Sequence, residues 1–271
     1  MIDNESGGYC MESRNPVFSR RGAFGQQASG SVPSAYRLEA MYNAPAYAPP
    51  RTMTIDDVVV RSFLTLGTLV AAGALAWVFV PERIANAVAI AAVVVGLIFW
   101  AILTFGRKIN PVLVLGFAAS YGVAVGVISH AYNSVYNGIV LQAVVGTALA
   151  FGAMLTVYAL RIVRVTPKFV RFVIAAGLAL VGLMVLNLLV SIFHVGGIGI
   201  RENGPLGIIF SVAAILVGCL YLLLDFSSIE DGVRSGAPEK ASWLAAFGLT
   251  LSLVWIYLEL LRFLSYFYNR D

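Results

Sequence analysis

The sequence predicts an all-α membrane protein: a seven-transmembrane-helix bundle at 56–271, preceded by a flexible, disordered tail at 1–55. Three observations predict this class. Of the 271 residues, 59% are hydrophobic and only 12% are charged, whereas soluble domains carry about 25% charged residues. Seven apolar runs follow one another, and each is long enough to cross a hydrocarbon core of about 30 Å. Turn-forming residues separate these runs.

The first 55 residues are rich in Gly, Ser, Pro and Arg and end in the proline-rich stretch "YNAPAYAPPR". Such a composition buries too little apolar surface to fold, which predicts a flexible tail. The tail contains no apolar run of the kind that a signal peptide carries, and Met11 is a second candidate start. The stretch "TIDD" at 54–57 then predicts a helix start, with a capping threonine and acids in the first turn.

The apolar runs predict helices rather than strands, because membrane barrels show alternating segments of about 10 residues. The expected spans are 58–80, 84–105, 111–132, 137–160, 169–193, 205–227 and 242–267. Their separators include "PERI", "GRKINP" and "SSIEDGVRSGAPEK", which predict turns and loops.

Small residues four apart occur in two of these spans, as Gly122 with Gly126 and as Gly67 with Ala71. Small side chains at this spacing let membrane helices approach closely. The contact they predict lies either inside the bundle or on a homodimer face, and the sequence leaves both interpretations open.

The basic residues lie mainly beside alternate apolar runs, which predicts the orientation of the chain. The second, fourth and sixth connections, together with the helix end next to the fourth, hold Arg107, Lys108, Arg161, Arg164, Lys168, Arg171, Arg234 and Lys240. The other connections hold only Arg83 and Arg201. Because Lys and Arg gather in cytoplasmic loops, we expect a cytoplasmic tail. The same rule accounts for the net charge of +4, so no nucleic-acid partner is predicted.

Among the 14 acidic residues, only Asp225 and Glu259 fall inside the apolar spans. A charged side chain at the centre of a helix in hydrocarbon costs about 2.5–3.5 kcal/mol on insertion scales. One interpretation is that both acids face the bundle interior and bind cations or protons. The other is structural: Asp225 reaches the membrane boundary, and Glu259 pairs with Arg262 on the same helix face.

The depths of the candidate residues follow from the helix rise. If the last span enters the membrane near Trp243, Glu259 lies roughly 24 Å further along the axis. Asp225 should lie in the last turn of its helix, so a direct pair of carboxylates is not expected. Ser252 is closer in depth to Asp225. The candidate ion or proton site therefore consists of Asp225, Ser252 and Glu259, with Asp225 as the candidate metal ligand.

Patterns of catalysis and cofactor binding are missing from the sequence. It contains no H-E-x-x-H, G-x-S-x-G or Walker A motif. The last span holds no lysine that could carry retinal. We therefore expect neither an enzyme nor a protein with a bound cofactor.

Several short motifs occur in an order that resembles the Bax-inhibitor family, in its bacterial YccA branch. "LLLDFSSI" around Asp225 is similar to the L-Y-D-x-x-x-I pattern that ends the family's sixth helix. "LELLRFLSYF" at the end of the last span is similar to the family's late L-L-R-F. Smaller matches are "IFW" at 98–100 and "ISH" at 128–130. The resemblance extends over roughly residues 58–268 and leaves the tail uncovered.

The resemblance implies a seven-helix fold with the last helix inside the bundle and a pH-sensitive leak of Ca²⁺ or protons governed by two aspartates. Asp225 takes the first aspartate position. The second falls on Ser252 when "LLRF" is aligned and on Glu259 when "YLE" is aligned. A family arginine in the second helix has Arg107 as its nearest basic counterpart, and Arg262 is the other candidate charge partner.

The family also implies a second role, a non-conducting modulator of a membrane protease or of a stress response through protein–protein interaction. Either role places the protein in membrane lipid, in the inner membrane of a bacterial cell. An ion-flux measurement separates the two roles, because a pure binding partner conducts nothing.

The orientation can be tested by labelling single cysteines, as in Arg107→Cys and Arg201→Cys. We expect a membrane-impermeant thiol reagent to reach the two positions from opposite sides of the membrane, because the positive-inside rule puts them on opposite sides. Labelling of both from the same side would contradict the predicted topology.

Overall fold

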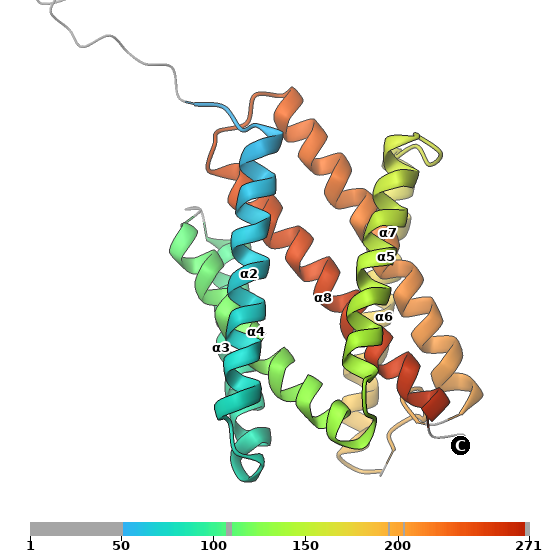
Figure 1. Ribbon diagram of the computed structural model, residues 1–271. Helices are drawn as coiled ribbons and strands as arrows, with labels where there is room; N and C mark the ends of the chain where they lie inside the picture. The colour runs from blue at the N-terminus through green and yellow to red at the C-terminus, as the bar shows by residue number, and fades with distance from the viewer. Residues whose placement is uncertain (1–50, 107–109, 195, 203, 269–271) are drawn as a thin grey trace, which may run out of the picture. The chain divides into compact units, whose positions relative to one another are not determined.

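The computed structural model describes residues 51–106, 110–194, 196–202 and 204–268. These residues form seven helices, each long and apolar enough to cross a membrane, which confirms the predicted seven-helix fold (Figure 1). The helices are α2 (Ile55–Phe79), α3 (Glu82–Phe105), α4 (Pro111–Val135), α5 (Ile139–Ala159), α6 (Pro167–Ser191), α7 (Pro205–Arg234) and α8 (Ala241–Tyr268). Residues 1–50 of the predicted tail at 1–55 lie outside the described residues.

The start of α2 matches the "TIDD" prediction. Thr54 caps the helix: its hydroxyl accepts from the Asp57 amide, and the Asp57 side chain accepts from the Thr54 amide, which is a capping box. Residues 51–54, assigned to the tail from sequence, contact the loop between α7 and α8. The Met53 amide donates to the Ala237 carbonyl at 2.8 Å, and the Met53 side chain is 4% exposed. The described fold therefore begins a few residues before α2.

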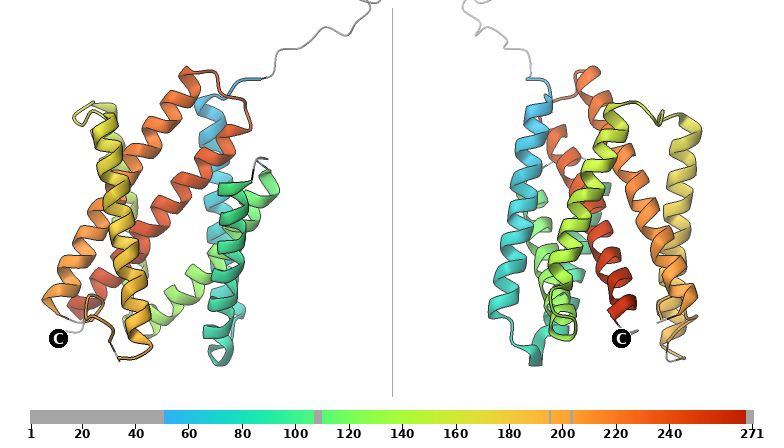
Figure 2. Two further views of the ribbon diagram at one scale, coloured as in Figure 1. Left: turned by 180° about the vertical axis from the view of Figure 1, so that it is seen from behind. Right: turned by 45° about the vertical axis from the view of Figure 1, so that its right-hand side comes forward.

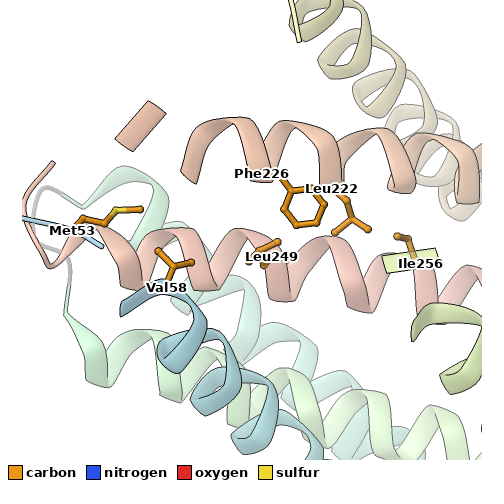
Figure 3. Packing of buried hydrophobic residues seen from close by; sticks show 6 residues of the cluster. All are labelled: Met53, Val58, Leu222, Phe226, Leu249 and Ile256. Atoms are coloured by element: carbon orange, nitrogen blue, oxygen red, sulfur yellow. The ribbon is translucent and has the colours of Figure 1, made fainter. Parts of the chain in front are cut away.

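Helix α8 runs among the other helices and packs against α7, α2, α5 and α4 (Figures 1 and 2). This is the inside position that the family resemblance implies. An apolar cluster joins the start of α2 to α7 and α8, and Figure 3 shows its buried members. They are Met53, Val58, Leu222, Phe226, Leu249 and Ile256. The packing fixes α7 beside α8, which positions Asp225.

Helices α2 and α4 approach each other through glycines. A Cβ atom on Gly126 would lie 2.2 Å from the Gly73 carbonyl oxygen, and one on Gly122 would lie 2.3 Å from that of Leu69. The predicted close approach at Gly122 and Gly126 is confirmed, and it lies inside the bundle. Gly67 makes no such contact inside the bundle, because nothing lies within 4 Å of its Cβ position, and the homodimer interpretation of Gly67 with Ala71 stays a prediction. Gly67 and Gly73 are about 120° apart around α2, and only Gly73 faces α4.

Helix α7 is longer than the sequence predicted, since it continues from residue 227 to Arg234. Polar residues do not by themselves end a helix, and an Arg234–Glu230 pair one turn apart, at 2.7 Å, supports this part. The chain turns only at Gly236, where φ is 68°. The prediction that Asp225 lies in the last turn of its helix is therefore wrong, because more than two turns follow it.

The glycine contact can be tested with Gly126→Ala. The added methyl group would force the backbones of α2 and α4 apart, and we expect a loss of about 1–3 kcal/mol in stability. Thermal unfolding in detergent measures it. Gly152→Ala is the matched control, because Gly152 also lies within a helix but nothing surrounds its Cβ position. Equal behaviour of the two variants would contradict the assignment.

Candidate ion site

Asp225 of α7 and Ser252 of α8 meet between their two helices. The Ser252 hydroxyl donates to Asp225 Oδ2 at 2.6 Å, and Ser252 is 7% exposed. Asp225 is half-buried. Gly248, one turn before Ser252, leaves room for the carboxylate, because a Cβ atom there would lie 3.1 Å from Asp225 Oδ1. The structure thus brings together two of the three residues predicted for the ion site.

The Asp225 carboxylate has no cationic side chain as a partner within the described part of the chain. The ion pairs of that part all involve other acids. The residues beside it, Leu222, Leu223 and Phe226, are buried and apolar. One neutral hydroxyl therefore orients the Asp225 carboxylate, and no arginine or lysine of the described residues neutralises it.

A metal ion at Asp225 would need ligands of other kinds. The described residues contain no group of three or more His, Cys, Asp and Glu side chains that could hold a metal. Calcium takes six to eight oxygen ligands, and one carboxylate supplies at most two of them. Hydroxyl groups such as that of Ser252, backbone carbonyls and water would have to complete the shell, so this donor set fits weak binding only.

Glu259, the third predicted site residue, lies elsewhere. It is 4% exposed and forms an ion pair of 2.8 Å with Arg201, which belongs to the loop between α6 and α7. Along α8 it lies roughly 10 Å beyond Ser252. The structure does not bring Asp225 and Glu259 together.

The structural interpretation predicted an ion pair between Arg262 and Glu259, and the structure does not form this pair. The Arg262 Nη2 donates to the backbone carbonyl of Arg201 at 2.6 Å and its Nε to the Tyr266 hydroxyl at 3.0 Å. The Glu259 carboxylate instead accepts a hydrogen bond from Nη2 of Arg201. Sequence reasoning missed Arg201 as a partner, although Arg201 and Arg83 are the only Lys or Arg residues in the first, third and fifth connections. Arg107, the remaining candidate, lies outside the described residues.

The other polar side chains of α8 bond to different neighbouring helices. These bonds join Thr250 to Thr65 of α2 at 3.1 Å, Tyr257 to Ser129 of α4 at 2.7 Å, and Trp255 to the Ala214 carbonyl of α7 at 3.1 Å. Hydrocarbon offers polar groups no partner, so a helix at this position must satisfy them within the protein. The network holds α8, and with it Ser252 and Glu259, in one register.

The comparison with known families agrees with the motifs in the sequence. A family model described as Bax inhibitor 1 like matches residues 15–269, so the expectation that the resemblance leaves the tail uncovered is wrong. No curated protein matches the sequence.

The Arg201–Glu259 pair can be tested with Arg201→Met, which leaves the Glu259 charge buried without a partner. Breaking a buried pair in this way typically costs about 3–5 kcal/mol, so we expect a clear fall in thermal stability in detergent. Arg234→Met is the control, because it breaks the exposed pair with Glu230 and should change stability little. A similar, small effect of both substitutions would show that the buried pair does not lock the loop.

Proposed function

The chain belongs to the Bax-inhibitor-1-like family and is an integral, multi-pass membrane protein, and we propose that it forms a pH-sensitive leak pathway for cations, either Ca²⁺ or protons. The observation that carries the proposal is the Asp225 carboxylate, which lies within a membrane-spanning helix and, among the described residues, has only Ser252 as a hydrogen-bond partner. Ionisable residues within membrane helices commonly mark ion or proton pathways.

The surroundings of Asp225 support a binding role over a purely structural one. A structural carboxylate in a membrane bundle is normally paired with a cation, as Glu259 is with Arg201. The Asp225 carboxylate is available to a mobile cation or proton, because the hydrogen bond from Ser252 occupies only one of its two oxygens. A proton needs no further ligand, whereas Ca²⁺ needs several more oxygens, so a weak Ca²⁺ site and a proton site both fit.

The charge distribution supports a cytoplasmic N-terminus, and we propose the bacterial inner membrane from the family resemblance alone. Exposed basic residues such as Arg164, Lys168 and Lys240 lie at the end of the bundle where α6 and α8 begin. At the opposite end, Arg201 is engaged by Glu259 within the bundle, which leaves Arg83 as the exposed basic residue among the described residues there.

Flux of Ca²⁺ and of protons into proteoliposomes, measured against pH, tests the proposal. Asp225→Asn removes the charge at nearly constant volume, so the variant should fold while its flux loses its pH dependence or shows a flatter one. Glu259→Gln should have a smaller effect on this profile, because Glu259 lies away from Asp225.

Asp231→Asn is the matched control, since Asp231 is an exposed acid on the same helix and should leave flux unchanged. Unchanged flux and pH profile in Asp225→Asn, beside a conducting wild type, would reduce Asp225 to a structural residue. A folded wild type that conducts neither ion would overturn the leak and favour the family's other role, modulation of a membrane protease or a stress response.

A further inference from the structure

An apolar groove lies between α2 and α5, and α8 forms part of its floor. The groove has a volume of about 1210 Å³ and is lined by residues of α2, α4, α5, α7 and α8. Within the described part of the chain, α2 and α5 do not pack against each other, and they stand apart on either side of α8 (Figure 1). The helices thus leave a recess over α8 that no other described residue fills.

The groove runs nearly the whole length of the membrane-spanning part. On α2 its lining residues extend from Ile55 to Val78, which is roughly 35 Å along the helix axis. The hydrocarbon core of a bilayer is about 30 Å thick. Most of the lining is apolar, and the lining hydroxyls of Ser129 and Tyr257 bond to each other. The groove therefore favours an apolar occupant over water.

The acyl chain of a lipid meets these requirements. Pockets of about 300–1,000 Å³ hold drug-sized molecules, so the groove has room for such a chain. An unfilled apolar recess loses the van der Waals contacts of its lining atoms. Lipid chains surround a membrane-spanning bundle, and one that enters the groove restores these contacts without leaving the bilayer.

Charged side chains gather at the mouth of the groove, where α2 begins and where α5 and α7 end. Tyr158 and Glu230 line this mouth, and the Tyr158 hydroxyl donates to the Glu230 carboxylate. Arg234 pairs with Glu230 at 2.7 Å, and Arg161 lies close enough to attract the same carboxylate. Arg161 is exposed and forms no ion pair with the described residues. Its guanidinium group can therefore bind a lipid phosphate, as basic residues at membrane surfaces do.

We propose that the groove binds one acyl chain of a phospholipid from the leaflet on the side where α2 begins, with the lipid phosphate held by Arg161. The acyl chain lies between α2 and α5 and contacts Leu66 of α2, Phe151 of α5 and Leu249 of α8, which line the groove. The second acyl chain of the lipid remains in the bilayer. This site is separate from the Asp225 carboxylate and does not depend on whether the protein conducts ions.

Substitutions that fill the groove test the proposal. Val59 and Val60 are neighbours on α2 and are 46% and 58% exposed, but only Val59 lines the groove. Val59→Trp should block the acyl chain, and Val60→Trp adds the same bulk outside the groove. Ala148→Trp repeats the test from α5, because Ala148 is an exposed groove residue, and Leu149→Trp is its control outside the groove.

The probe is dioleoyl phosphatidylglycerol, added to the purified protein in detergent. At about ten times its dissociation constant, it should raise the melting temperature of the wild type and of Val60→Trp by about 3–6 °C. The rise in Val59→Trp and Ala148→Trp should be less than half as large. Native mass spectrometry should show one phospholipid retained by the wild type and by the two controls, and lost from the two groove variants.

The phosphate contact is tested separately. Arg161→Gln should lower the fraction of protein that retains the phospholipid severalfold. Arg171→Gln is the matched control, because it removes an exposed positive charge from α6, which does not line the groove. Oleate, a single chain without a phosphate, should raise the melting temperature less than the phospholipid does. Equal effects of the two arginine substitutions, or of the two lipids, would overturn the assignment of the phosphate to Arg161.

Equal responses to phospholipid in the groove variants and their controls would overturn the proposal, because the lipid would then act on the outer surface of the bundle. A wild type that retains no phospholipid would overturn it as well. If that wild type were a dimer that Val59→Trp and Ala148→Trp dissociate, the groove would belong to a second copy of the chain. None of these outcomes depends on the flux experiments.

Discussion

The structure depends on one constraint: the polar side chains of α8 must find their partners inside the protein. Helix α8 packs against four other helices, and the bilayer would offer its hydroxyl, indole and carboxylate groups no hydrogen bonds. Four of these groups therefore bond to three neighbouring helices: Thr250 to α2, Tyr257 to α4, and both Ser252 and Trp255 to α7. These directional bonds fix the rotation and height of α8 against its neighbours, which apolar packing alone would leave less defined.

The same constraint separates the roles of the two carboxylates within the membrane-spanning helices. Glu259 is almost fully buried and has an arginine partner, so its charge is compensated and the pair anchors the loop that carries Arg201. Asp225 is only half-buried, and its partner within the described part of the chain is a neutral hydroxyl rather than a cation. A carboxylate paired with an arginine suits a structural contact, and a carboxylate without a cationic partner suits a site that exchanges cations or protons.

The two ends of α7 show how the helices around α8 are tied together. Near its start, Arg201 and Arg262 join the preceding loop to α8 through an ion pair and a carbonyl bond. Beyond its end, the Met53 amide joins the start of the described chain to the loop that leads into α8. Asp225 lies between these two joints, in a stretch where α7 is bonded to α8 by Ser252 and packed through Leu222 and Phe226.

Local signals in the sequence determined the helices and several of their starts. Thr54 with Asp57 marked the start of α2, and the continuous apolar runs marked seven spans, because capping and hydropathy act within a few residues. The sequence also singled out Asp225 and Glu259, since acids are rare in such runs, and its short motifs pointed to the family that the comparison found.

The helix rise put Ser252 near Asp225 in depth, but only the tertiary structure decided that these two side chains meet and that Glu259 pairs with Arg201 rather than Arg262. Arg201 and Glu259 are 58 positions apart, and Asp225 and Ser252 are 27 apart. No local pattern encodes such pairs, because they depend on how far each helix is rotated and shifted against its neighbour. For the same reason Gly73 rather than Gly67 meets α4, and Asp225 lies well inside α7, where the helix continues until Gly236 turns the chain. Composition and periodicity set what each helix is, and the packing of distant helices sets what each side chain touches.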